Sequence, residues 1–314
     1  MAKCPISMII TVNDNEEEKL VHCLNSIISQ GSWDFEVIIV NNGSKSESLV
    51  ALCEGYREKD PRVSVIHMDH SEQADAYNKG LEAAAGRYVH FIDANDQLEE
   101  KSLEKVIPLL LQNPDVVFID TDYYNAPNYW DISHANVLRR LSRSVPDRLW
   151  DKLIRRDLLV REDLWFSNGI WESVDFCILL YIHAKVYNAV DFKYYKRHTV
   201  AENLNNANVF GKIILTLAKW AGPAESTYEE YSTVIHNWMT VMYCDLLLPM
   251  YSTLSKNDRD EFKQSMNDFQ WLLDMRRKNH IVQALYAAFG PLGVSYLTRL
   301  FVMLILVVRN QKGI

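Results

Sequence analysis

The sequence lacks the glycine-rich turns with which many α/β proteins hold nucleotides. Only 11 of its 314 residues are glycine, and neither a Gly-x-Gly-x-x-Gly motif nor a Walker-type loop follows the first apolar segment. A dinucleotide fingerprint and a P-loop are therefore excluded. Internal repeats and low-complexity blocks are also absent, which excludes solenoids and disordered tracts.

Cysteine is sparse, and its spacing matches no metal-binding motif. The chain has five cysteines, an odd number that argues against a disulfide framework and favours a reduced compartment. An apolar segment begins within a few residues of Met1, so we expect no signal peptide and a cytoplasmic protein.

Acidic residues are absent beyond Asp274, although the whole chain has a net charge of −8. The acidic balance disfavours a nucleic-acid partner, because the phosphate backbone attracts basic surfaces. The segment beyond Asp274 instead carries six basic residues, which are Arg276, Arg277, Lys278, Arg299, Arg309 and Lys312.

No apolar run in this C-terminal segment is long enough to cross a bilayer. The run Leu300–Val308 has nine residues, whereas a membrane span needs about 20. Basic residues that flank apolar ones are typical of a segment lying on an anionic membrane. We therefore expect residues 281–314 to bind the inner face of the cell membrane peripherally. A helix that docks on the core, or in a homodimer interface, is the alternative.

Strands and helices alternate over the first 120 residues. Apolar runs predict strands at Ile6–Val12, Phe35–Val40, Val63–Met68, Arg87–Ile92 and Val116–Ile119. Helical spacing predicts helices at Glu16–Gln30, Leu49–Lys59, Asp75–Ala85 and Leu98–Gln112, with Gly86 as the C-cap of the third. This order predicts an α/β, Rossmann-like fold with a mostly parallel sheet flanked by helices.

The chain becomes helical throughout after about residue 205. Ser255 precedes Asp258 by three residues and is a predicted cap of one of these helices. We expect one domain over residues 1–204 and a helical C-terminal region over residues 205–314.

The segment Asp93-Ala94-Asn95-Asp96 follows the fourth predicted strand directly. Ligands of open α/β sheets bind beyond the carboxyl ends of strands, and these side chains offer oxygen ligands for a metal or a ribose. Asp and Asn also end strands as ordinary turn residues. Taken alone, the segment favours a turn.

Six segments in order resemble the family 2 glycosyltransferases, which have the GT-A fold. They are Ile6–Glu16, Asn41–Ser44, Tyr77–Gly80, Phe91–Asp96, Trp150–Arg156 and Tyr194–His198. The resemblance implies a non-processive, inverting transfer of one sugar from a nucleotide-sugar donor, UDP-linked by expectation. The acceptor would be a saccharide, as in a lipid-linked or surface-polysaccharide precursor, and the basic cluster Arg139–Arg148 would lie near its diphosphate. The Gln-x-x-Arg-Trp signature of processive synthases is absent.

The same resemblance assigns roles to individual residues. Donor-binding residues are expected at Thr11, Val12, Glu16, Asn41, Asn42, Asn78, Asp93 and Asn95. A site for Mn²⁺ or Mg²⁺ is expected at Asp93, Asp96 and His198, where the imidazole nitrogen would favour Mn²⁺.

The chain departs from the family pattern at several of these positions. The family has an acidic pair where this chain has Glu172-Ser173, and serine cannot act as a general base unaided. Glu172 or Asp175 would then be the catalytic base, although a carboxylate at a helix N-terminus also has a structural explanation. Tyr77 replaces a phosphate-contacting arginine, and Asn41-Asn42 replaces two aspartates. A degenerate protein that serves as a binding or scaffolding subunit is therefore the second hypothesis. An unrelated Rossmann-like enzyme with another cofactor is the third.

Overall fold

The computed structural model describes residues 6–13, 17–31, 34–119, 133–141, 148–197, 207–222, 224, 226–251, 253–269 and 272. The chain divides into two compact units, one of residues 1–137 and 146–200, the other of residues 138–145 and 201–314. The sequence predicted a domain boundary after residue 204, and the two units of the structure divide after residue 200. Glu16, His198 and the tail 281–314 lie outside the described residues.

The first unit contains a mixed, mostly parallel sheet of seven strands in the order β3-β2-β1-β4-β7-β6-β8. The strands are β1 (Ile6–Val12), β2 (Phe35–Asn42), β3 (Val63–Met68), β4 (Tyr88–Ile92), β6 (Val116–Phe118), β7 (Lys152–Arg155) and β8 (Tyr187–Ala189). Strand β7 is antiparallel to β4 and β6, while the other pairings are parallel. A separate ribbon pairs β5 (Gln97–Leu98) with β9 (Tyr195–Lys196). The predicted fold class is confirmed.

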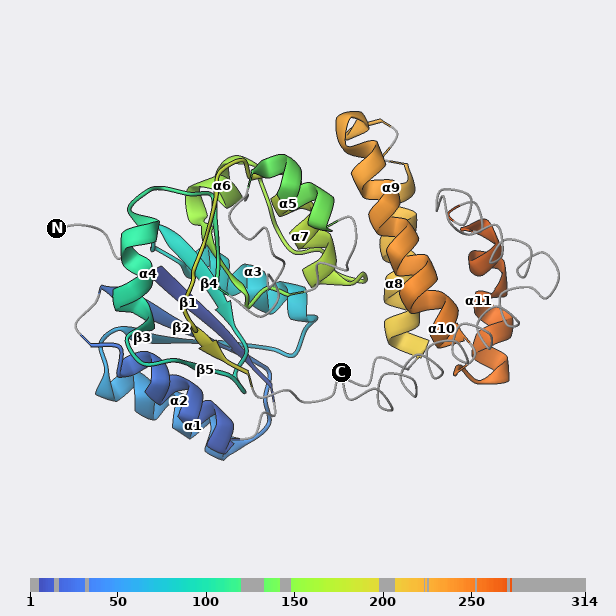
Figure 1. Ribbon diagram of the computed structural model, residues 1–314. Helices are drawn as coiled ribbons and strands as arrows, with labels where there is room; N and C mark the ends of the chain where they lie inside the picture. Colours follow the sequence, from blue (N-terminus) through green and yellow to red (C-terminus); the bar gives the residue numbers. More distant parts are fainter. Residues whose placement is uncertain are drawn as a thin grey trace, which may run out of the picture. The chain divides into compact units, whose positions relative to one another are not determined.

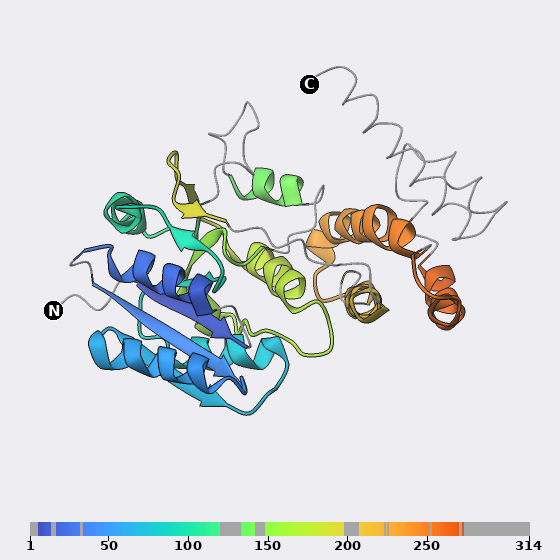
Figure 2. The ribbon, with the colours of Figure 1, turned by 90° about the horizontal axis from the view of Figure 1, so that it is seen from below.

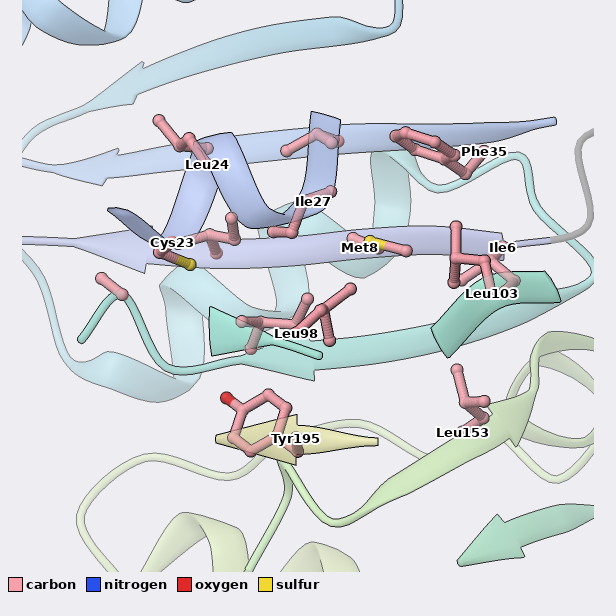
Figure 3. Packing of buried hydrophobic residues seen from close by; sticks show 14 of the residues in the cluster. Ile6, Met8, Cys23, Leu24, Ile27, Phe35, Leu98, Leu103, Leu153 and Tyr195 are labelled. Atoms are coloured by element: carbon pink, nitrogen blue, oxygen red, sulfur yellow. The ribbon is translucent and has the colours of Figure 1, made fainter. Parts of the chain in front are cut away.

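Helices flank the sheet on both faces (Figure 1 and Figure 2). They are α1 (Glu17–Ile28), α2 (Glu47–Lys59), α3 (Gln73–Ala83), α4 (Ser102–Leu110), α6 (Arg156–Arg161) and α7 (Glu172–His183). The division between the two units falls within a further helix, α5 (His134–Leu141). Because side chains alternate along a strand, Met8 of β1 joins a core with Cys23 and Leu24 of α1, as Figure 3 shows. Ile9 points the other way, toward Gly80 of α3.

Two local predictions around β4 are wrong. Gly86 is not a helix cap, since α3 ends at Ala83 and Ala84 takes that position. The Gly86 N–H donates instead to Ser7 Oγ at 2.8 Å, and a Cβ there would lie 2.6 Å from Ser7 N. Leu98 is not helical, because it pairs with Tyr195 in β9. In both cases a partner distant in sequence overrides the local pattern.

The described part of the second unit contains α8 (Ala207–Ala221), α9 (Ser232–Val241), α10 (Leu248–Tyr251) and α11 (Lys256–Asp268), with a 3₁₀ turn η2 (Glu229–Tyr231) and a π-helical segment η3 (Met242–Leu247). Ser255 caps α11 as predicted, since its side chain accepts from Asp258 N. Phe210, Trp220 and Trp238 are buried. No helix in the described part of the chain is both long and apolar enough to span a membrane.

Two helical glycines provide a matched test of packing between α3 and the sheet. A methyl group on Gly80 would overlap Ile9 Cγ2 and lie 3.3 Å from Val40 Cγ2, whereas no described atom lies within 4 Å of one on Gly55 in α2. Gly80→Ala should lower the free energy of unfolding by about 1–3 kcal/mol through overpacking. Gly55→Ala should raise it by about 0.5–1 kcal/mol through helix propensity. Urea unfolding followed by circular dichroism measures both, and equal effects would contradict this packing.

His90 of β4 gives the fold a dependence on pH. Its imidazole is fully buried, and Nε2 donates to Trp150 O at 3.0 Å. Burial lowers the pKa of His90 to about 4, below its usual 6.5. The unfolded chain therefore takes up this proton first as pH falls. The His90 contribution is complete above pH 6.5 and is lost toward pH 4.

We expect His90 to account for a loss of about 2 kcal/mol in unfolding free energy between pH 7 and pH 5. Urea titrations at the two pH values test this in the parent protein and in His90→Gln, whose side chain does not titrate. The variant should show the smaller pH dependence. Identical pH dependence in both proteins would refute a buried neutral imidazole.

Candidate active site

The turn after β4, residues Asp93–Asp96, is held by its own hydrogen bonds and carries two carboxylates. Asp93 Oδ1 accepts from Asn95 N at 2.9 Å and from Asn95 Nδ2 at 3.0 Å, and Asp96 N donates to Asp93 O at 3.0 Å. The Asp93 side chain is exposed, whereas Asp96 is only 4% exposed. The Asn95 amide is thus engaged within the turn, which carries one exposed carboxylate, Asp93, and one buried carboxylate, Asp96.

Two neutral groups lie beneath this turn. Asp93 N donates to the Tyr195 hydroxyl at 3.2 Å, and the Cys23 thiol donates to Asp93 O at 3.7 Å. Burial raises the pKa values of Cys23 and Tyr195, and the negative charges of Asp93 and Asp96 raise both further. The two carboxylates therefore act together on one region, where a cation would be favoured.

The donor set fits a hard divalent cation that is completed by the substrate. Among the described residues, no group of three or more His, Cys, Asp or Glu side chains is placed to hold a metal. Mg²⁺ binds through one or two carboxylates, waters and substrate phosphates rather than an all-protein cage. Asp93 and Asp96 meet that requirement.

Asparagine amides hold the turn after β2. Asn42 is 2% exposed, and its Nδ2 donates to Ser71 O at 3.0 Å while its Oδ1 accepts from Ser71 N at 3.0 Å. Asn41 Oδ1 accepts from Ser44 N at 2.9 Å, and its Nδ2 donates to His67 Nδ1 at 3.2 Å. A carboxylate at position 42 would face the Ser71 carbonyl, which explains an amide there.

A third amide clamp positions the segment before α7. Asn78 Nδ2 donates to Phe166 O and Asn78 Oδ1 accepts from Phe166 N, both at 2.9 Å. The Phe166 ring stacks on Phe176 at 4.0 Å and contacts Phe91 at 5.2 Å. Asn78 therefore ties α3 to the loop that leads into α7.

Tyr77 connects the β4 turn with the start of α7. Thr11 Oγ1 accepts from Gln73 Nε2 at 2.6 Å. The Tyr77 ring contacts Phe91 and Phe166, with 5.4 and 4.9 Å between ring centroids. Burial raises the pKa of Tyr77 to about 12, and the negative charges of Glu172 and Asp93 contribute to the rise. One hydroxyl is thus within electrostatic reach of both carboxylates. Val12 is buried and pairs with Asn41.

The two candidate bases differ in accessibility. Glu172 is the first residue of α7 and is half-buried, as is Ser173. Asp175 also lies in the first turn, but its side chain is fully buried. Of the two carboxylates, Glu172 is the one that an acceptor hydroxyl can approach in this arrangement.

Sequence reasoning missed the hydrogen bond between Gln73 and Thr11, and the ring stack formed by Trp150 and Tyr195 at 5.5 Å. The resemblance had marked the segments that contain most of these residues. Their contacts join residues far apart in the chain, and periodicity carries no signal for them.

Substitution of Asn41 or Asn42 by aspartate should change the free energy of unfolding by different amounts. Asn42→Asp places an acceptor against the Ser71 carbonyl, which has no proton to offer, so the free energy of unfolding should fall by about 1–3 kcal/mol. Asn41→Asp faces His67 Nδ1. Because His67 Nε2 already donates to Glu54 Oε1 at 2.7 Å, a second proton on Nδ1 would place the ring between two carboxylates that both favour it, so the cost should stay below about 1 kcal/mol. Urea unfolding of the two variants tests the clamp. Equal losses would contradict it.

Comparison with known proteins places this geometry in a family. Residues 8–163 match the model of glycosyl transferase family 2. The uncharacterized glycosyltransferase YibD of Escherichia coli is 26% identical over 204 residues, which cover 60% of this chain and 58% of YibD. The chain spans about half the length of the curated relatives it matches.

Solved structures share the fold at low sequence identity. Residues 1–349 of S. aureus TarS, in complex with UDP-GlcNAc, superpose with a TM-score of 0.71 at 17% identity, covering 93% of this chain and 89% of that one. The mannosyltransferase PcManGT of Pyrobaculum calidifontis, with GDP-Man and Mn²⁺, gives 0.56 at 15% identity, covering 98% and 81%. The unit that carries the Asp93–Asp96 turn has the GT-A fold, and over residues 8–163 the chain belongs to glycosyl transferase family 2.

Proposed function

We propose that the protein is a metal-dependent, inverting, non-processive glycosyltransferase. It would transfer one sugar from a UDP-linked donor to a hydroxyl of a lipid-linked or surface-polysaccharide precursor. One observation carries the proposal: the carboxylates of Asp93 and Asp96 follow β4 directly at the carboxyl edge of the parallel strands β1 and β4, in a chain whose residues 8–163 match glycosyl transferase family 2. Ligands of open α/β sheets bind beyond this edge, which is where the proposed metal and donor would lie.

The similarity to enzymes in complex with UDP-GlcNAc, and with GDP-Man and Mn²⁺, supports a nucleotide-sugar donor. Asp93 and Asp96 would hold Mn²⁺ or Mg²⁺, which neutralises charge on the diphosphate leaving group when bound. Thr11 and Val12, at the end of β1, would border the nucleoside. We assign Asn41, Asn42 and Asn78 to positioning the donor loops, because their amides bind neighbouring backbone and side-chain groups.

Glu172 is the proposed general base. The acceptor oxygen bonds to the anomeric carbon on the face opposite the diphosphate, and the Glu172 carboxylate takes the hydroxyl proton. The bond between the anomeric carbon and the diphosphate oxygen breaks, and the nucleoside diphosphate leaves with the electron pair. Attack from the opposite face inverts the anomeric configuration. The buried Asp175 would stabilise the N-terminus of α7.

A membrane-borne acceptor is consistent with the C-terminal charge. Residues 281–314 include Arg299, Arg309 and Lys312 and no acidic residue. We include in the proposal that this tail binds anionic lipid on the inner face of the cell membrane, where such a precursor would be presented.

Release of UDP from a panel of UDP-sugars in Mn²⁺ tests the catalytic assignment. Glu172→Gln should lower kcat by about 100-fold or more, since it removes the general base. Asp96→Asn should abolish the stimulation by Mn²⁺. Ser173→Ala serves as the neighbouring control and should retain activity.

A second candidate function rests on Ser173, which occupies the position of the usual base. If the parent protein binds UDP but turns over no donor, a binding or scaffolding role replaces catalysis. Full activity in Glu172→Gln would instead move the base to another residue.

A further inference from the structure

The sequence contains two Asn-Gly pairs, and the fold places them in contrasting surroundings. One is Asn42-Gly43, in the turn after β2, and the other is Asn168-Gly169, in the loop that leads into α7. Both glycines have a left-handed backbone, with φ of 72° at Gly43 and 76° at Gly169. The two pairs therefore share their residue types and their glycine conformation, and they differ in what surrounds them.

The Asn168-Gly169 pair is open to solvent and lies against two carboxylates. Both residues are exposed, and a Cβ on Gly169 would have no described atom within 4 Å. Asn168 Nδ2 donates to Asp75 Oδ1 at 2.8 Å, and Gly169 N donates to Glu72 Oε2 at 2.7 Å. Glu72 precedes the first residue of α3, and Asp75 lies in the first turn of that helix. Water thus reaches the pair, and a carboxylate already accepts from the Gly169 N–H.

The Asn42-Gly43 pair is enclosed. Asn42 is 2% exposed, and both polar atoms of its amide are hydrogen-bonded to the main chain of Ser71. A Cβ on Gly43 would overlap the main chain of His70. The Asn42 side chain would have to give up both hydrogen bonds before it could turn toward the nitrogen of Gly43.

An asparagine that precedes glycine can lose its amide without an enzyme. The backbone nitrogen of the following residue attacks the side-chain carbon, and glycine hinders this approach least because it has no Cβ. Here the bond from Gly169 N to Asn168 Cγ would form, the bond from Cγ to Nδ2 would break, and Nδ2 would leave as ammonia with the proton that Gly169 N gives up. Water then opens the cyclic imide at one of its two carbonyls, which leaves aspartate or isoaspartate at position 168.

The product would no longer fit its partner on α3. The Asp75 carboxylate accepts a hydrogen bond from the amide, whereas a carboxylate at position 168 has no proton to donate and carries the same charge. Isoaspartate would also lengthen the main chain by one carbon. The loop would therefore lose its tie to Asp75, while the Asn78 amide would still hold Phe166 at its start.

We propose that Asn168-Gly169 is a site of spontaneous deamidation, in which Glu72 accepts the proton of the Gly169 N–H, and that the reaction releases this loop from α3. The inference goes beyond the proposed function and does not depend on it, because the reaction needs only the folded chain and water.

Peptide mapping by mass spectrometry, during incubation of the folded protein in mildly alkaline buffer, follows both pairs in one sample. Asn168 should convert to aspartate and isoaspartate with release of ammonia. Asn42 should convert at least about tenfold more slowly, because its amide must first leave both Ser71 partners. The two rates should become similar in urea, where these surroundings are lost. Equal rates in the folded protein would overturn the proposal, and so would an Asn168 that converts only in urea.

Glu72→Gln tests the assigned base, since the variant keeps a hydrogen-bond acceptor but cannot take up the proton. Conversion of Asn168 should slow by about tenfold, a smaller factor than general bases reach in evolved active sites. Glu82→Gln is the matched control, because Glu82 is an exposed carboxylate of the same helix that pairs with Lys79. Faster conversion in Glu72→Gln would show that the contact protects the pair, which would overturn the role of Glu72.

Asn168→Asp tests the release of the loop, because it places the product's charge at position 168 from the start. Backbone amides of residues 167–171 should exchange with deuterium faster than in the parent protein, while those of β1 should be unchanged. Equal exchange of the loop amides in the two proteins would refute the release, whatever the rate of deamidation.

Discussion

Side-chain amides that pair with main-chain groups are the constraint on which the site depends. At the carboxyl edge of the sheet, loops must leave the strands without leaving backbone N–H and C=O groups unpaired. Asn42 and Asn78 solve this in the same manner, each giving one donor and one acceptor to a single residue of a distant loop. An amide offers a donor and an acceptor side by side, whereas a carboxylate offers only acceptors and an aliphatic side chain neither, so Asp or an aliphatic residue at these positions would carry a cost. The clamps fix where Ser71 and Phe166 lie, and with them the approaches to α3 and α7.

The departures from the family pattern share one physical feature, which is the loss of a charge. Asn41, Asn42 and Tyr77 are neutral side chains at positions where the family resemblance predicts charged ones. Neutral groups at these positions mean that fewer ionised groups have to be buried to build this edge of the sheet.

Much of the fold could be predicted because apolar patterns reflect burial directly. Strands β1 and β3 begin and end at the predicted residues, and the Asp93–Asp96 turn follows β4 as expected. Prediction failed where a distant partner decides the local structure, as with Leu98 against Tyr195 and Gly86 against Ser7. In the candidate site too, local motifs could be predicted and contacts between distant residues could not. Motifs at strand ends marked Asp93 and Asp96, whereas the stack of Trp150 on Tyr195 joins residues distant in the chain and leaves no periodic trace.

The thiol beneath the β4 turn has a consequence for the chemistry of the folded protein. Only a thiolate reacts readily with alkylating agents or disulfides. Cys23 is fully buried, and its pKa is raised by burial and by two neighbouring carboxylates, so it stays protonated and inert. Modification then requires α1 to separate from the sheet. The rate at which Cys23 reacts with an excess of reagent therefore measures the rate at which α1 opens locally from the sheet that supports the β4 turn.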